Sequence, residues 1–485
     1  MSIQSVADFG CGKWKNREVI LQPIEQDLSS DAGLMLFGQF DEKLDWTKQF
    51  SSLIKDARSD PEHSILSIVR QRVFGILAGY EDQNDHDTLR SDPVFKILSG
   101  KTPGESDLAS QPTISRLENA VKPSDLLRLE QWFLDKFVES FESQPSLITL
   151  DIDTYADAAH GDQQLTFWHD YYEQNQYQVR LVTCAESDMI VFPVLLFESA
   201  SVKLAAADDL QRIIEAIRVR FPEVAIHVRA DSGFAGPDIY EMLKSFEKVT
   251  YTIGMSINPK TKILSENLLQ ETIAAQQESG QDQVRYMSIV GYKCRNWKKT
   301  ARNLVVKCEA TAHSTSRRVL VSNRSEVPET PEVVYREYAE RGESENRNKE
   351  LKCGLSGDRL SDHRVMANIF RMMMHCLSHN LLVSLRRLVA EPIPELKENP
   401  ESEPPSTNRP FKETRAERKF HNDRRKRDPL GEGHPCTWRT HIIKVAARIV
   451  VSARRVVLQM SASWPHIKYF KKVASAIERY CAHPS

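Results

Sequence analysis

The chain has 485 residues, a formal net charge of −2 at neutral pH, 40% hydrophobic residues and 27% charged residues. This length exceeds one ordinary domain, and the composition is that of a globular protein rather than a fibrous or disordered one. The sequence has no run of eighteen apolar residues and no secretory signal pattern, so we expect a cytosolic protein outside any membrane. Its eight scattered cysteines form no C-x-x-C pair, which argues against a disulfide framework or a structural zinc site.

Residues 1 to 145 are predicted to form a mainly helical domain. An apolar stripe at helical spacing extends from Ile65 to Tyr80. The segment SQPTISRLENAV, with Pro112 near its start, predicts the beginning of a helix, similar to the second helix of a helix-turn-helix. Many core helices begin in the same way, so this pattern is compatible with DNA binding and with a purely structural helix.

From residue 146 the pattern changes to strands alternating with helices, which predicts an α/β core with a mixed sheet. Residues 147 to 153 alternate, so Asp151 and Asp153 are expected on the same side of one strand. A second apolar strand ends at Asp231 and continues through a turn into a helical pattern. An Asp at the carboxyl end of a strand lies where open α/β sheets bind ligands. Each Asp by itself is better explained as a turn former or helix cap; their recurrence favours a site.

Residues 256 to 330 contain three strand-like segments, QVRYMSIVGYK, RNLVVKCEA and RRVLVSN. Trp297 lies among Arg295, Lys298 and Lys299. An aromatic side chain in basic surroundings is a candidate for stacking on an extruded DNA base. Packing of Trp297 against the strands of its own segment is the alternative, and it is the commoner role of a tryptophan.

The stretch YREYAERGESENRNKELK carries Tyr338, Arg341, Glu345 and Lys352 at offsets of three, seven and fourteen from the first of them. On a continuous helix these offsets keep all four side chains on one face. A carboxylate flanked by two cations and a phenol can hold a metal ion and a phosphate together. A solvated helix with one Arg-to-Glu pair has the same spacing, so this face is meaningful only together with the two Asp-bearing strands.

Gly342 and Ser344 lie inside this stretch and weaken the prediction of one continuous helix. Glycine in a helix interior costs about 1 kcal/mol relative to alanine, and a serine there can cap a new helix. A break at this point would remove Tyr338 and Arg341 from the common face.

The C-terminal part differs from the rest in composition and charge. Residues 391 to 435 begin with a stretch rich in proline and glutamate, which predicts an extended linker. From residue 409 to residue 485 there are 18 Lys or Arg and 6 Asp or Glu, a net charge of +12 that leaves −14 for the remainder. Such a basic segment is the footprint expected of contacts with DNA phosphates, although a solvated tail has the same composition.

Two groups of cations stand out within this part. The first is a run of four candidates for DNA binding, Arg424, Arg425, Lys426 and Arg427. The second lies in residues 436 to 485, which we predict to be a basic helical segment, and comprises Lys444, Arg448, Arg454 and Arg455.

Taken together, these segments resemble a known family, the transposase DDE domain, group 1, of bacterial insertion-sequence transposases that carry a Tyr-Arg-Glu-Lys signature. The similar blocks are FGILAGYEDQNDHDTLRSDPVFK, LASQPTISRLEN, LDIDTYADAAHGDQQ, VRADSGF, the signature stretch with the helix after it, and RTHIIKVAARIVVSARRVV. They occur in the family's order and cover most of residues 60 to 460.

The resemblance implies a ribonuclease-H-like catalytic core made of residues 146 to 255 and 331 to 390, interrupted by a β-rich insertion at 256 to 330. It also implies that Asp153, Asp231 and Glu345 are the catalytic carboxylates and bind two Mg²⁺ or Mn²⁺ ions. Two such cations can activate water and stabilise the phosphoryl group during cleavage of a DNA phosphodiester, and hard cations prefer oxygen ligands. Asp151 is the alternative to Asp153; the family's spacing from Asp to His160 favours Asp153.

By the same resemblance, Tyr338, Arg341 and Lys352 hold the DNA backbone beside the cleaved bond. The expected function is cut-and-paste transposition, with cleavage and strand transfer at the ends of the element, a hairpin intermediate, and a homodimer that bridges two double-stranded DNA ends. Two alternatives remain: a ribonuclease-H-like nuclease without strand transfer, and an inactive DNA-binding relic.

Overall fold

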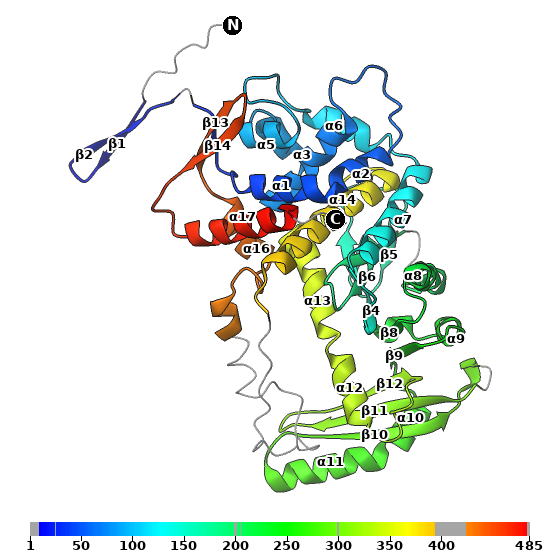
Figure 1. The fold of residues 1–485 in the computed structure, drawn as a ribbon. Helices are drawn as coiled ribbons and strands as arrows, with labels where there is room; N and C mark the ends of the chain where they lie inside the picture. The colour runs from blue at the N-terminus through cyan, green and yellow to red at the C-terminus, as the bar shows by residue number, and fades with distance from the viewer. Residues whose placement is uncertain are drawn as a thin grey trace.

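The computed structural model of the protein describes residues 9–24, 26–197, 201–203, 205–297, 300–392 and 423–482. Within these ranges the largest element is a nine-stranded mixed sheet, flanked by helices (Figure 1). Its central strands, in spatial order, are β7 (Ile190–Leu196), β6 (Gln174–Cys184), β4 (Leu147–Ala158), β8 (Ala225–Ala230) and β9 (Val249–Met255). β4, β8 and β9 are parallel, whereas β6 is antiparallel to β4 and to β7. The short β5 (Phe167–His169) also pairs with β6. The predicted α/β class with a mixed sheet is therefore confirmed.

β7 is largely buried along its length, which explains its continuous apolar sequence IVFPVLL, whereas β8 is also largely buried but includes His227 and Arg229. α8 (Ala206–Arg220) connects β7 to β8 and buries Leu210, Ile213 and Ile217 at helical spacing. α9 (Pro237–Lys244) connects β8 to β9, so the parallel strands are joined by helical crossovers.

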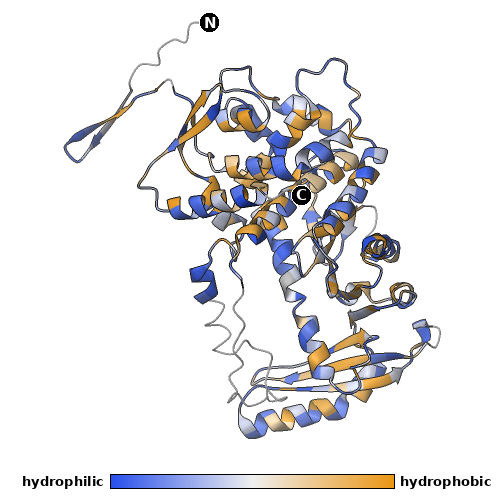
Figure 2. Ribbon diagram, in the orientation of Figure 1, coloured by the Kyte–Doolittle hydropathy of each residue, from blue (hydrophilic) through white to orange (hydrophobic). Residues whose placement is uncertain are grey.

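The predicted segment 256 to 330 extends this sheet. Its three expected strands are β10 (Gln283–Tyr292), β11 (Arg302–Ala310) and β12 (Thr315–Ser322), and β12 pairs with the core strand β9. The segment also contains α10 (Pro259–Leu264) and α11 (Glu266–Ser279), which the sequence analysis did not predict. In Figure 2 hydrophobic residues run through these strands, while α11, which packs on β10 and β11, shows both hydrophobic and hydrophilic residues.

The N-terminal part is mainly helical, as predicted, but it starts with strands. A hairpin of β1 (Phe9–Trp14) and β2 (Arg17–Leu21) is followed by β3 (Leu28–Ser29). The helices that follow are α1 (Leu34–Leu44), α2 (Trp46–Ser52), α3 (Ile65–Ala78), η1 (Gln83–Asp85), α4 (His86–Leu89), α5 (Pro93–Leu98), α6 (Gln111–Glu118) and α7 (Pro123–Glu139). The apolar stripe from Ile65 lies on α3, which Ser64 caps and which ends at Gly79 with a φ of 92°.

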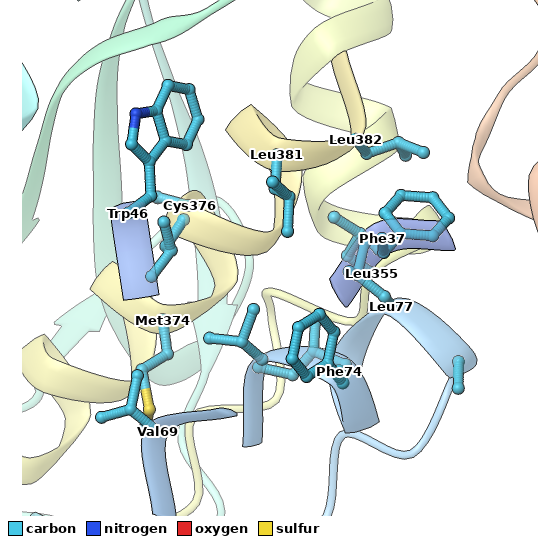
Figure 3. Packing of buried hydrophobic residues seen from close by; sticks show 14 of the residues in the cluster. Phe37, Trp46, Val69, Phe74, Leu77, Leu355, Met374, Cys376, Leu381 and Leu382 are labelled. Atoms are coloured by element: carbon cyan, nitrogen blue, oxygen red, sulfur yellow. The ribbon is translucent and has the colours of Figure 1, made fainter. Parts of the chain in front are cut away.

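A single apolar core joins this helical part to the last helices. α14 (Val365–Val389) is buried on nearly all sides and packs against α3. Figure 3 shows the contact, made by Phe37, Trp46, Val69, Phe74 and Leu77 on one side and Leu355, Met374, Cys376, Leu381 and Leu382 on the other. Of the helices described, even the 25-residue α14 lacks the apolar length that crossing a membrane requires.

The C-terminal segment differs from the prediction. Residues 436 to 485 were expected to be helical, but Arg448 lies on β13 (Ala447–Ser452) and Arg455 on β14 (Arg455–Met460). The helical prediction is wrong here because alternating β-branched residues such as Ile449 and Val451 favour a strand. As far as this segment is described, up to residue 482, helical structure is restricted to α16 (Pro435–Trp438), a π-helical turn η5 (Arg439–Ile443) and α17 (Ile467–Ala482). Of the predicted linker, residues 393–422 lie outside the described residues, and residues 423–427 form a helical turn.

Candidate active site

Two parallel strands bring the first pair of predicted carboxylates to one edge of the sheet. Ile152 of β4 lies opposite Ala230 of β8, so Asp153 and Asp231 follow at equivalent positions. The Asp231 carboxylate accepts a hydrogen bond of 2.8 Å from the Gly233 N–H, which fixes it at the start of the turn η2 (Ser232–Phe234). This is the position at which parallel sheets present ligand-binding groups.

The signature stretch forms two helices instead of one. α12 (Pro331–Ala339) ends before Arg341, and α13 (Gly342–Lys349) begins at the glycine that the sequence analysis identified as a weak point. Glu340 and Arg341 nevertheless keep right-handed helical backbone angles. For that reason the break does not separate Arg341 from Tyr338 and Glu345. We had expected a break at Gly342 to remove Tyr338 and Arg341 from the face that carries Glu345, and this expectation is wrong.

Arg341 is the centre of the cluster. Its guanidinium donates to Asp153 Oδ2 at 3.2 Å and to Glu345 Oε1 at 3.1 Å. It also lies 5.8 Å from the centre of the Tyr338 ring. The Tyr338 hydroxyl donates to the Ala230 carbonyl at 3.2 Å, directly before Asp231. The structure therefore gathers Asp153, Asp231, Tyr338, Arg341 and Glu345 as one group.

Electrostatics support this grouping. Burial raises the pKa of the Asp153 carboxyl above its usual value, and the positive charge of Arg341 opposes the shift. The carboxylates of Asp231 and Glu345 raise the same pKa further, so Asp153 interacts with both other acids. Burial likewise raises the pKa of Tyr338, so this phenol stays a hydrogen-bond donor at neutral pH.

Asp151, the alternative to Asp153, is committed to another partner. Its two oxygens accept hydrogen bonds of 2.7 and 2.8 Å from Arg229, and its side chain is 2% exposed. Arg229 also donates to the Glu337 carbonyl at 2.7 Å, which ties the end of α12 to β8. The sequence analysis missed this role of Arg229, because only the pairing of β4 with β8 places it opposite Asp151.

Lys352 lies beside this cluster rather than in it. It belongs to a π-helical turn, η4 (Glu350–Gly354), that continues α13. Its Nζ is 5.9 Å from the centre of the Tyr155 ring and 4.0 Å from Asp358 Oδ2. These residues line a cavity of about 440 Å³, together with Thr154, Tyr172, His160 and Arg359 among others. Thr154 follows Asp153 in β4 but points to the other side of the strand by alternation, and none of the five clustered residues lines the cavity.

The assignment of Trp297 to base stacking is wrong. Its side chain is 6% exposed and packs edge-on against Tyr240 and Tyr292, with ring centres 5.8 and 5.6 Å away. The Arg302 guanidinium lies 5.6 Å from its ring and closes the contact. A base cannot stack on an indole that the protein already encloses. Lys298 and Lys299, which motivated the prediction, lie outside the described residues.

The basic run at 424 to 427 has partners within the chain. Arg424 lies 2.5 Å from a Glu432 oxygen, and Arg427 lies 3.7 Å from a Glu391 oxygen. Arg425 and Lys426 are exposed. DNA binding by these four residues stays a prediction.

The donor chemistry of the cluster fits a hard divalent cation, because Asp153, Asp231 and Glu345 all offer carboxylate oxygens. In the described part of the chain, no three His, Cys, Asp or Glu side chains are already arranged as a metal site. Arg341 lies between Asp153 and Glu345, so binding of an ion there requires the guanidinium to turn away.

Comparison with protein-family models identifies the family of the chain. The model of the family described as transposase DDE domain group 1 matches residues 12–397. The chain belongs to this family. As a transposase it is an enzyme that acts on DNA, and all three carboxylates lie within the matched range. The block at 439 to 457, which we also compared with the family, lies beyond that range.

Two solved transposase structures resemble the chain at low identity. The piggyBac transposase synaptic complex with hairpin DNA shares 12% identity at a TM-score of 0.42, covering 74% of this chain and 77% of that one. The Drosophila P element transposase strand transfer complex shares 12% identity at a TM-score of 0.19, with 44% and 48% coverage. Among curated proteins, the comparison finds no match.

Proposed function

We propose that the protein catalyses metal-dependent cleavage and strand transfer at the ends of a bacterial insertion sequence, by cut-and-paste transposition. The observation that carries this proposal is the bridge that Arg341 forms between Asp153 and Glu345, beside Asp231 at the end of β8. A carboxylate at Asp153 that interacts with both Asp231 and Glu345, together with the Arg341 cation, suits a reaction that needs both metal ions and a bound phosphate.

In this proposal Asp153, Asp231 and Glu345 hold two Mg²⁺ or Mn²⁺ ions. When bound, such ions supply activated water and stabilise the negative charge that develops on phosphorus. Burial raises the pKa of Asp153, and the positive charge of Arg341 opposes this rise and so favours the ionised carboxylate. When it turns to the DNA, its planar guanidinium can hold a phosphate with two hydrogen bonds.

Tyr338 and Lys352 have supporting roles in binding the DNA backbone. Tyr338 is fixed by the Ala230 carbonyl, so its position depends on the same strand as Asp231. Lys352 lines the cavity described above and can hold a neighbouring phosphate of the same DNA strand. The signature thus supplies one binding group on each side of Glu345.

The arrangement of the five central strands supports a ribonuclease-H-like core, in which residues 146–255 and 331–390 form one unit. Residues 1–145 would bind the element's terminal repeats, and the extension at 256–330 would contact the same DNA beside the cleft. A homodimer in the cytoplasm that bridges two ends, with a hairpin intermediate, completes the proposal.

The test measures cleavage of DNA that carries the element's own ends, with Mg²⁺ or Mn²⁺. We expect Asp153→Asn, Asp231→Asn and Glu345→Gln to reduce cleavage at least a hundredfold while DNA binding and the unfolding midpoint stay near wild type. Asp151→Asn is the comparison variant. Because it breaks a buried ion pair, it should lower the free energy of unfolding by about 3–5 kcal/mol.

The outcomes separate the alternatives. Cutting without preference for the element's ends, and without strand joining, would favour a nuclease. Specific binding of the ends with no cutting under either metal would favour an inactive copy. Full cleavage by Asp153→Asn would overturn the assignment of the first carboxylate.

A further inference from the structure

The N-terminal hairpin lies apart from the body of the molecule. Residues 10 to 24 are all exposed, and Figure 1 shows β1 and β2 projecting away from the helices. The strands pair up to Trp14 and Arg17, so Lys15 and Asn16 form a two-residue turn, with Lys15 at a φ of 55°. An isolated two-stranded ribbon is marginally stable in water. The hairpin is therefore a candidate for a binding element.

Its tip is strongly basic. Lys13, Lys15 and Arg17 fall within five residues, and the only acid between residues 9 and 24 is Glu18. None of these three cations forms an ion pair with another described residue. Glu18 lies opposite Lys13 in the hairpin register, so one acid accompanies three cations and the net charge of residues 9–24 is +2. An excess of exposed cations attracts an anionic partner.

A second basic hairpin lies next to the first in the fold. Arg448, Arg454 and Arg455, on β13, at its turn and on β14, are exposed and have no ion pair among the described residues. The surrounding sequence, residues 433 to 477, contains eight Lys or Arg and no Asp or Glu. By contrast, Lys444 is neutralised by Asp31 at 2.6 Å, so the chain does pair cations in this region where acids are available.

The fold joins the two hairpins. β3 pairs with β13, and the Ile449 N–H donates to the Asp27 carbonyl at 2.7 Å. Leu21, the last residue of β2, precedes β3 by seven residues, so the base of the first hairpin lies within about 25 Å of the second. We call Lys13, Lys15, Arg17, Arg448, Arg454 and Arg455 the two-hairpin surface.

We infer that the two-hairpin surface binds duplex DNA away from the cleaved phosphodiester, an inference that rests on the proposed transposase function. Six exposed cations that form no ion pair within the described part of the chain match a row of phosphates, and a two-stranded ribbon fits the major groove. A second copy of this chain suits the surface less well, because a two-fold contact would bring the same cations together. In Figure 1 the surface lies on the opposite side of the molecule from β8 and β9, so its DNA is not the segment at the carboxylates.

The experiment measures the affinity of the full chain for a long duplex carrying an element end, by fluorescence anisotropy at several salt concentrations. The variants are Lys13→Gln with Lys15→Gln, and Arg454→Gln with Arg455→Gln. Lys55→Gln with Lys244→Gln, two exposed lysines elsewhere, is the control of equal charge change. Each test pair should lower the slope of log affinity against log salt by about 2, since each lost phosphate contact contributes about 0.9.

Cleavage of a short duplex that spans only the element boundary should stay at the wild-type rate in both test variants. Wild-type affinity and slope in both, with an unchanged unfolding midpoint, would overturn the inference. A halved molecular mass of the variants in solution, with unchanged DNA binding, would assign the surface to a second copy instead. A wild type that binds with the expected slopes but never cleaves would contradict the proposed function and leave this surface standing.

Discussion

At the scale of residues, one strand holds three carboxylates that differ in their ion-pair and hydrogen-bond partners. Asp151, Asp153 and Asp157 all point to the same side of β4 by alternation. The first is neutralised by Arg229, and the second shares Arg341 with Glu345. Among the described residues, neither oxygen of Asp157 has a hydrogen-bond partner of ordinary geometry. Their roles therefore depend on tertiary partners and not on their common residue type.

Asp157 predicts a pH dependence of stability. Burial raises the pKa of the Asp157 carboxyl to about 8, although the Leu360 N–H and the positive charge of Lys352 act to lower it. In the unfolded chain the pKa of an Asp is about 3.9. Between these values the folded state holds one more proton, so the free energy of unfolding falls as pH rises from about 4 to about 8. Asp157→Asn removes this dependence and should stabilise the protein most above pH 8, by up to several kcal/mol at about 1.4 kcal/mol per pH unit.

The measurement is urea unfolding of wild type and Asp157→Asn at about pH 5, 6.5 and 8. Asp170→Asn, at an exposed carboxylate, should change stability little at each pH. A constant difference between Asp157→Asn and wild type across this range would contradict the assignment.

At the scale of elements, what the sequence could predict depends on how local the signal is. The helical spacing of Tyr338, Arg341 and Glu345 and the weak point at Gly342 are local, and both are found in the structure. The strands of residues 283 to 322 were also predictable, but not their pairing with β9, since that contact is between distant segments. The hairpin at Ile449 did have a local signal in its β-branched residues, because β13 pairs along its length with the adjacent β14, and the helical prediction overlooked it. Only the pairing of β13 with β3, more than 400 residues away, had no local signal.

Gly254 of β9 permits the close packing behind Asp231. A Cβ at this position would lie 2.8 Å from the Ser232 nitrogen, 3.1 Å from the Asp231 carbonyl carbon and 3.3 Å from the Tyr338 hydroxyl. Two of these atoms belong to the backbone and cannot rotate away. Gly254→Ala should therefore shift the turn that carries the Asp231 carboxylate, at a cost of about 1–3 kcal/mol.

We expect Gly254→Ala to lower DNA cleavage more than tenfold while DNA affinity changes little. Gly104→Ala is the matched control, because a Cβ there meets nothing within 4 Å. Single-turnover cleavage and equilibrium binding of the two variants measure the effect. Wild-type cleavage by Gly254→Ala would show that the turn tolerates the displacement.

At the scale of the whole molecule, the two ends of the chain complete one core. The Ala32 N–H donates to the Val445 carbonyl at 3.2 Å, and Arg439 donates to the Leu77 carbonyl at 2.8 Å. Apolar residues of α17, such as Val473 and Ile477, belong to the same cluster as α1 and α3. Contacts across more than 300 residues have no local signature, which is why the sequence suggested a separate basic tail instead.

Glu350 connects the core shared by the N-terminal and C-terminal helices to the candidate active site. It is 3% exposed and lies in η4, directly after the helix that carries Glu345. Its partners come from three parts of the chain: Arg347 at 2.8 Å, Arg386 of α14 at 2.8 Å, His434 at 2.8 Å and His379 at 3.5 Å. Burial acts to raise its pKa, but these hydrogen bonds and positive charges outweigh it and hold the pKa well below the usual value.

Replacing Glu350 by glutamine should therefore destabilise the whole fold. Glu350→Gln removes the buried carboxylate that Arg347 and Arg386 share and leaves them Asp188, at 3.1 and 3.2 Å, as a carboxylate partner. The cost at neutral pH should therefore approach, without exceeding, the about 3–5 kcal/mol of a fully broken buried ion pair. Because the folded pKa is depressed, the stabilisation exists above the unfolded value of about 4.3 and is lost as pH falls. The unfolding free energies of the variant and the wild type should thus converge on acidification below about pH 4. Urea unfolding at pH 7 and below about pH 4 measures these free energies. Glu329→Gln, at an exposed site, should unfold with the wild-type free energy at both pH values. Equal unfolding free energies of Glu350→Gln and wild type at pH 7 would exclude Glu350 as a stabilising link.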